Sequence, residues 1–279
     1  MTIWSGADLD LDAYLARIGY YGERVATLDA LRALHRGHTT SIPFENLELM
    51  LGRSLPLDLE SLTDKLIRSP RGGYCFEHQS LFAAALERFG FTFTALTGRV
   101  MLGSPTVRPA THALTLVELG AGERWLCDVG FGRGPLEPVP FVDGAEVDQD
   151  GWRLRLTQES LGWTLWQRSD VDGEVVWLDR HVFTLNPQYR IDWQVGNHYV
   201  STSPRSPFTM RPFVQRYTVE RHDTLDGTTW TTTSPDGSSV ERAVGLDDVP
   251  ELLAGTFDVV LSDDDSAGLV EWMRLRVDG

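Results

Sequence analysis

The sequence contains only two cysteines in 279 residues, Cys75 and Cys127. Two thiols cannot form a framework of several disulfides, which favours a reducing compartment. No uninterrupted apolar run approaches the roughly 18 residues that a membrane-spanning helix needs. The first 15 residues hold three aspartates and no basic residue, unlike a secretory signal. These absences predict a cytoplasmic protein with no membrane partner.

Basic residues are also scarce, since 25 Lys and Arg stand against 40 Asp and Glu and give a formal charge of −15. An acidic surface repels nucleic acid and anionic membranes, so neither is expected as a partner. The apolar fraction of 42% and the nine tryptophans indicate a packed globular chain. The length suggests roughly two domains, with one large or three small domains as alternatives. The charge favours solubility and leaves the oligomeric state undetermined.

Hydrophobic periodicity predicts an α+β fold. Up to about residue 90 the leucines recur at helical spacing, with Thr27 as an N-cap and Gly90 as a C-cap. From residue 91 the period changes to two, and short strands separated by polar turns suggest a small barrel or a sandwich. The last third mixes strands with two closing helices. We therefore predict a helical region at 1–90 that carries the nucleophile, a β region at 91–190 and an α/β region at 191–279.

The stretch RGGYCFEHQ (residues 71–79) places Cys75 where a glycine-rich turn leads into a helix. Backbone N–H groups in the first turn of a helix have no intrahelical partner, and the helix dipole adds partial positive charge there. Both effects favour a thiolate. The same N–H groups could hold the oxyanion that forms when a thiolate attacks a carbonyl. The pattern therefore predicts a nucleophilic Cys75, although a lone cysteine is more commonly a small core residue.

A cysteine nucleophile needs a base, and the base needs an orienting group. His112 opens one predicted strand, and Asp128 lies near the end of the next. If Leu119 paired with Arg124, the two side chains would face opposite sides of the sheet. If Glu118 pairs with Arg124, they share one face as diagonal neighbours. We predict the second register, with Asp128 holding the His112 imidazole and Cys75 at its other nitrogen.

Two residues compete with this interpretation. His78 lies one helical turn after Cys75 and is a rival base, but its attachment to the same helix makes the geometry awkward. Cys127 precedes Asp128 in a strand, so its side chain points to the opposite face and into the core. No CxxC or HExxH spacing is present, so no metal site is predicted.

Four motifs give the sequence a family resemblance: RGGYCFEHQ, IPFENL (42–47), THALTLVEL (111–119) and CDVGFG (127–132). The motifs, their order and their spacing resemble those of the arylamine N-acetyltransferases, and the chain length is also similar. The stretch NHYVSTSPRSPF (197–208) resembles a later motif of that family. The resemblance implies a papain-like Cys–His–Asp arrangement formed by Cys75, His112 and Asp128. It implies an N-terminal helical bundle, a central β-barrel that carries the histidine and aspartate, and a C-terminal α/β lid.

The resemblance also implies an activity. Acetyl-CoA is the expected co-substrate, with no permanently bound cofactor, and small aromatic amines and hydrazines are the expected acceptors. The acetyl group would pass through acetyl-Cys75 by a ping-pong mechanism, in xenobiotic metabolism. Three phenylalanines are the candidate walls of an apolar pocket that excludes water, with two glycines for close approach and a threonine for the pantetheine chain: Phe44, Phe131, Phe208, Gly130, Gly132 and Thr111.

Charged residues near the motifs have supporting roles in this interpretation. Arg71 and Glu45 are expected to form a buried pair that braces the cysteine loop, as the resemblance implies. Local positive charge for the CoA phosphates could come from three arginines near the motifs: Arg99, Arg108 and Arg133.

Two alternatives use the same residues differently. A cysteine hydrolase or a transglutaminase-like amidase would employ the same triad with another acceptor. A non-enzymatic acyl-CoA-binding or aromatic-ligand-binding protein would leave the thiol of Cys75 inert.

Overall fold

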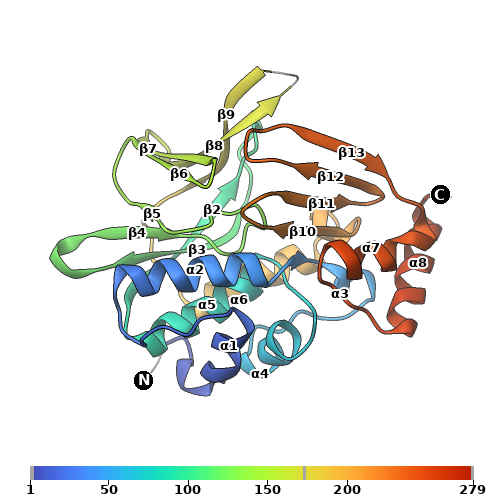
Figure 1. Ribbon diagram of the computed structural model, residues 1–279, viewed down its shortest axis with the longest axis horizontal. Coiled ribbons are helices and arrows are strands. Elements are labelled where there is room, and N and C mark those ends of the chain that lie inside the picture. The colour runs from blue at the N-terminus through green and yellow to red at the C-terminus, as the bar shows by residue number, and fades with distance from the viewer. Residues whose placement is uncertain (1–2, 172–173, 278–279) are drawn as a thin grey trace.

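The computed structural model describes residues 3–171 and 174–277 of the chain. The N-terminal third is helical and forms the lower layer in Figure 1. Its helices are α1 (Leu11–Arg17), α2 (Leu28–Ser41), α3 (Leu47–Met50), α4 (Leu59–Leu62) and α5 (Cys75–Phe89). The predicted caps are confirmed: the Thr27 side chain accepts a hydrogen bond from the Ala30 amide, and Gly90 ends α5 with a φ of 81°.

The central region is an antiparallel, eight-stranded sheet in the order β5-β4-β3-β2-β9-β8-β7-β6. The edge strands β5 and β6 contact each other, so the sheet is a nearly closed barrel rather than a sandwich. Leucines and aromatic rings from most of the strands fill its core. The strands are β2 (Thr92–Val100), β3 (Ala110–Glu118), β4 (Arg124–Cys127), β5 (Val139–Pro140), β6 (Ala145–Gln149), β7 (Trp152–Glu159), β8 (Gly162–Val171) and β9 (Glu174–Phe183).

The C-terminal region combines a second antiparallel sheet with three helices. The sheet has the order β1-β10-β11-β12-β13 and lies beside the barrel in Figure 1, with α7 and α8 at its end. Its edge strand β1 (Phe44–Glu45) comes from the N-terminal third and pairs with β10. The other elements are α6 (Arg190–Thr202), β10 (Phe213–Tyr217), β11 (His222–Asp226), β12 (Thr229–Thr233), β13 (Ser239–Ala243), α7 (Val249–Thr256) and α8 (Asp263–Val277).

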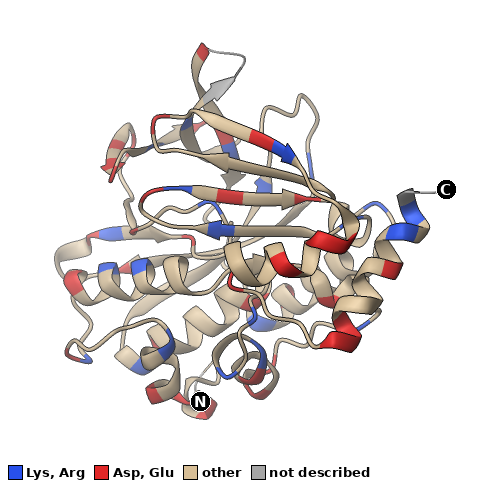
Figure 2. Cartoon of the chain, turned by 45° about the vertical axis from the view of Figure 1, so that its right-hand side comes forward, with Lys and Arg blue, Asp and Glu red and all other residues tan. Residues whose placement is uncertain are grey.

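This architecture confirms the predicted α+β class with a helical region, a barrel and a C-terminal α/β region. The division at residues 90 and 190 stays a prediction. Acidic and basic positions are interspersed along most elements in Figure 2, so the net charge of −15 is distributed over the molecule. Within residues 3–171 and 174–277, no helix has the length and apolar character needed to cross a membrane.

Candidate active site

Cys75 is the first residue of α5 and follows a tightly packed loop. A Cβ at Gly72 would lie 1.8 Å from the Pro43 carbonyl oxygen, so only glycine fits at that position. Cys75 is 4% exposed, and its Sγ lies 3.6 Å from the carbonyl oxygen of Thr111. The thiol is thus held at a helix N-terminus and faces the start of β3.

His112 and Asp128 come from neighbouring strands in the register that the sequence predicts. Glu118 of β3 pairs with Arg124 of β4. Nε2 of His112 donates to both carboxylate oxygens of Asp128 at 3.0 Å, and the Gly130 amide donates to Oδ1 at 3.3 Å. Both side chains are buried. The carboxylate therefore orients the imidazole and leaves Nδ1 available for another bond.

The imidazole of His112 also lies close enough to Cys75 for the sulfur to favour its charged form. Burial disfavours a charged imidazole, but the Asp128 carboxylate and the Cys75 contact outweigh it and raise the pKa of His112 to about 9. Burial alone would raise the pKa of Asp128, but the charge of His112 and its hydrogen bond outweigh burial and lower that pKa to about 2. At neutral pH the site can therefore hold an imidazolium between a carboxylate and a sulfur, the arrangement that activates a cysteine nucleophile.

Three phenylalanines predicted as pocket walls lie around this group. The rings of Phe131 and His112 pack edge to face. Their planes meet at 85°, and their centroids lie 5.2 Å apart. The ring centroids of Phe44 and Phe208 lie 5.8 Å apart, and both rings belong to one apolar cluster with Cys75. The structure therefore brings Phe131 to the histidine side and the other two rings to the cysteine side.

The glycines that flank Phe131 pack closely against the protein itself. A Cβ at Gly130 would lie 2.9 Å from the Cys75 Cα. Gly132 has a φ of +84°, and its Cβ would lie 2.2 Å from Nε2 of Gln215 and 3.0 Å from the Cβ of Phe44. Glycine is required at both positions by this packing, a reason that the sequence alone does not supply.

Comparison with known proteins agrees with this geometry. Residues 27–266 match the family model described as N-acetyltransferase. The arylamine N-acetyltransferase of Escherichia coli (strain K12) is 38% identical over 200 residues, which cover 71% of this chain and 69% of the relative. The chain belongs to the arylamine N-acetyltransferase family. It is accordingly an enzyme of the acyltransferase class.

Solved structures of the family share the fold over nearly the whole length. The Nocardia farcinica arylamine N-acetyltransferase has a TM-score of 0.92 and 52% sequence identity, and the alignment covers 98% of each chain. The Mycobacterium marinum enzyme in complex with CoA has a TM-score of 0.84 and 29% identity, covering 96% of this chain and 98% of that one. The family fold is thus present in full, and one solved relative holds CoA.

The cysteine loop is braced by a buried ionic cluster. Nε of Arg71 donates to Oε1 of Glu45 at 3.0 Å, so the predicted pair is in contact. Lys65 lies 2.8 Å from Glu77 and 3.8 Å from Glu45. Burial would raise the pKa of Glu45, but Lys65 and Arg71 outweigh it and lower that pKa. Glu77 in turn accepts a hydrogen bond at 3.0 Å from the amide of Tyr74, which precedes Cys75.

Sequence reasoning missed several residues that contact the site. Nε2 of His35 accepts a hydrogen bond from the Asp128 amide at 3.1 Å, and its Nδ1 donates to the Leu136 carbonyl. His181 and Arg180 of β9 lie beside Asp128 and Phe131. The cluster residues Lys65 and Glu77 were missed too. None of these five residues belongs to a spacing pattern with Asp128, and only the presence of seven histidines hinted that some would be buried partners.

The rival residues are engaged elsewhere. Nδ1 of His78 lies 2.8 Å from Nε2 of His38, and its Nε2 donates to the Pro43 carbonyl at 3.1 Å. Both nitrogens of the His78 imidazole are therefore occupied. Cys127 lies in the core cluster formed by the N-terminal helices, as predicted, and burial raises its pKa well above the ordinary value.

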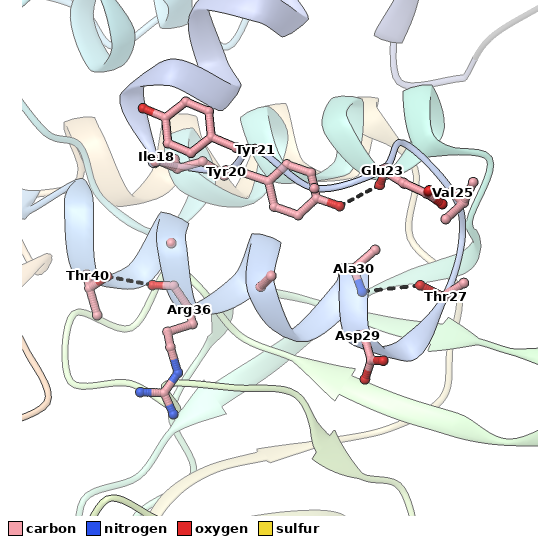
Figure 3. Close-up of a pocket in the computed structure, with 14 residues that line it drawn as sticks. Ile18, Tyr20, Tyr21, Glu23, Val25, Thr27, Asp29, Ala30, Arg36 and Thr40 are labelled. Atoms are coloured by element: carbon pink, nitrogen blue, oxygen red, sulfur yellow. Dashed lines mark hydrogen bonds between the residues drawn. The ribbon is translucent and has the colours of Figure 1, made fainter.

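Two cavities differ in their relation to the site. One of ≈ 430 Å³ lies between β2, β3 and α6 and is lined in part by Thr111, next to His112. The other, of ≈ 640 Å³, lies between α2 and the segment that follows α1, and Figure 3 shows Tyr20 and Arg36 in its wall. None of the three residues Cys75, His112 and Asp128 lines this larger cavity.

The three arginines predicted near the CoA phosphates differ in their surroundings. Arg99 and Arg108 are exposed near the start of β3, and Nη1 of Arg99 donates a hydrogen bond to the Arg108 carbonyl oxygen. By contrast, burial lowers the pKa of Arg133.

Three buried residues have donor atoms that lie within 4.8 Å of one another: His112, Asp128 and His181. This donor set is chemically able to bind a zinc ion. In this geometry, however, Nε2 of His112 already donates a proton to the carboxylate, and a metal would have to displace that proton. The residues fit a hydrogen-bonded catalytic group without a metal.

Proposed function

We propose that the chain transfers an acetyl group from acetyl-CoA to small aromatic amines and hydrazines through an acetylated Cys75. The observation that carries this proposal is the buried hydrogen bond of His112 to Asp128 beside Cys75, which raises the pKa of His112. Cys75 is the nucleophile, His112 the general base and acid, and Asp128 the orienting carboxylate. The CoA complex of the M. marinum relative and the names of the family members support the substrates.

The first half-reaction acylates the enzyme. His112 holds the proton of the Cys75 thiol, and the thiolate attacks the carbonyl carbon of the acetyl-CoA thioester. Backbone N–H groups at the start of α5 are positioned to stabilise the oxyanion. As the intermediate collapses, the carbon–sulfur bond to CoA breaks and His112 donates the proton to the departing CoA sulfur. The product is acetyl-Cys75 and free CoA.

The second half-reaction transfers the acetyl group to nitrogen. The amine attacks the carbonyl of acetyl-Cys75, His112 removes the amine proton, and the Cys75 thiolate leaves. Formation of an amide from a thioester makes this half downhill. Phe44, Phe131 and Phe208 form the apolar walls that hold a flat ring and exclude water. Gly130 and Gly132 lie beside them, and Thr111 is placed to bond the pantetheine chain.

Arg71 and Glu45 have a structural role in this proposal, because they connect the cysteine loop to β1. The need for a reduced Cys75 supports a cytoplasmic location. The proposed aromatic amine and hydrazine acceptors support a role in xenobiotic metabolism.

Steady-state kinetics test the proposal. Initial rates measured over a grid of acetyl-CoA and arylamine concentrations should give parallel double-reciprocal lines, because CoA leaves before the amine binds. Replacement of Cys75 by serine should abolish turnover, while the matched Cys127→Ser variant should retain it. Intersecting lines would indicate direct transfer and contradict the acetyl-cysteine intermediate. Cleavage of peptides or glutamine amides without acetyl transfer would indicate the alternative cysteine hydrolase or transglutaminase-like amidase.

A further inference from the structure

A β-bulge in the barrel wall places two consecutive residues of β9 on the same side. Leu165 of β8 pairs with His181, whereas the next residue, Trp166, pairs with Asp179. The ladder therefore skips Arg180. Consecutive residues of a regular strand face opposite sides, but a bulge changes the direction of one side chain, and bulges are frequent next to active sites.

Contacts with Phe131 confirm that both side chains point to the active site. The Arg180 guanidinium lies 3.9 Å from the Phe131 ring centroid, and the His181 ring lies 5.8 Å from it. Nη1 of Arg180 donates to the Arg133 carbonyl and Nη2 to the Gly134 carbonyl, which fix the guanidinium in place. The bulge thus brings His181 next to the group formed by His112 and Asp128.

His181 is completely buried beside the carboxylate of Asp128. Nδ1 lies 3.7 Å from Oδ2 of Asp128, and the ring centroid lies 5.0 Å from that of His112. Among the described residues, neither ring nitrogen has a partner within hydrogen-bond distance. A neutral imidazole always carries one N–H, and a buried donor without an acceptor is costly. A small rotation of either side chain would close the gap to Oδ2.

We infer that His181 is a positioning residue that directs its Nδ1–H toward Oδ2 of Asp128, so that the carboxylate is held between two imidazoles. This inference rests on the proposed function, because its effect on the reaction passes through Asp128 and His112. The second imidazole prevents rotation of the carboxylate about its Cβ–Cγ bond. Asp128 then keeps an oxygen directed at His112 Nε2 while the imidazole gains and loses charge.

The surroundings of His181 keep it neutral, as this role requires. The charged or titratable groups that face it are Asp128 after β4, His112 of β3 and Arg180 of its own strand. Burial lowers the pKa of His181 to about 3, against the opposing effect of Asp128 and with help from His112 and Arg180. A charged His181 would compete with His112 for the carboxylate. A neutral one donates a hydrogen bond and leaves the negative charge to stabilise the His112 imidazolium.

The test compares two variants by the pH dependence of Cys75 alkylation with iodoacetamide and by the rate of acetyl transfer. In His181→Phe the aromatic volume is kept and the donor is lost, so both rates at pH 7 should fall about 10-fold, the size expected for a hydrogen bond to a charged group. The midpoint of the alkylation profile should also shift. His181→Asn carries an amide N–H near the position of Nδ1 and should recover to within about 3-fold of the wild type.

Val182→Ala is the matched control, because Val182 follows His181 in β9 and is only half-buried. It should leave the pH profile unchanged. A purely structural role of His181 predicts a lower melting temperature without a shift of the alkylation midpoint. An unchanged midpoint in His181→Phe, together with active wild-type enzyme, would overturn the inference. Wild-type enzyme that forms no acetyl-Cys75 would instead contradict the proposed function.

A measurement on the wild-type protein keeps the inference testable if His181→Phe does not fold. Imidazole nitrogen chemical shifts at neutral pH should show His181 as a neutral ring protonated at Nδ1. Protonation at Nε2 would place the Nδ1 lone pair against the carboxylate and would overturn the inference, whatever the activity of the enzyme.

Discussion

Replacement of Asp128 by asparagine is expected to slow acetylation of Cys75 by roughly 10⁴-fold, the effect of this change in other triads. The variant keeps the shape of the side chain but removes the charge that raises the pKa of His112. Both carboxylate oxygens accept the Nε2 proton in the wild type, whereas an amide offers only one acceptor. The measurement is a single-turnover reaction with acetyl-CoA at pH 7, followed by quantitation of acetylated protein.

The rate of Cys75 alkylation in the wild type and in Asp128→Asn should depend on pH in different ways. A pKa of about 9 keeps His112 mostly charged up to pH 8, so alkylation of wild-type Cys75 should remain fast between pH 6 and 8. Without Asp128 the imidazole should titrate near its ordinary value of about 6.5. A thiol without an imidazolium partner forms thiolate only as the pH rises toward about 8.5. The ratio of wild-type to Asp128→Asn alkylation rates should therefore be largest near pH 6 and should fall as the pH rises. The exposed change Asp29→Asn is the control, and equal profiles for Asp128→Asn and wild type would contradict this account.

Replacement of Arg71 by alanine should lower the free energy of unfolding by about 3–5 kcal/mol, because it leaves a buried carboxylate with too few partners. Glu45 is fully buried and accepts hydrogen bonds from Nε of Arg71 and from the Leu47 amide. Without Arg71 its remaining cation is Lys65, which Glu77 also uses. Urea unfolding measures the loss, and the folded fraction should keep most of its specific activity.

Arg68 provides the comparison for Arg71, since it lies three residues earlier and forms an exposed pair with Asp64. Arg68→Ala should change the free energy of unfolding by less than about 1 kcal/mol. Equal destabilisation by the two variants would show that the buried cluster adds nothing specific. Loss of specific activity in Arg71→Ala at unchanged stability would place Arg71 in the chemistry instead of in the support of the loop.

Local signals in the sequence predicted much of the fold and the centre of the site. Thr27 and Gly90 mark helix ends by their own chemistry, and the turn of residues 119–123 restricts β3 and β4 to few registers. Cys75 could be singled out as the proposed nucleophile because a glycine turn and a helix start are adjacent in the sequence. These features depend on neighbours along the chain, which a single sequence displays.

The missed features depend on contacts between distant parts of the chain. The bond from the Asp128 amide to His35 joins residues 93 positions apart. The bulge at Arg180 shifts the register within β9, so alternation along the strand gives the wrong face for one of its residues. The strand β1 joins a sheet whose other strands begin at residue 213. No local propensity encodes such contacts, which arise only when the regions pack together.

The central claim is tested most directly by the intact mass of the protein after mixing with acetyl-CoA alone. The account predicts a gain of one acetyl group, mapped to the peptide that contains Cys75, and its complete loss when an arylamine is added. An acetyl group on another residue, or a protein that stays unmodified while it converts acetyl-CoA and amine to product, would contradict it.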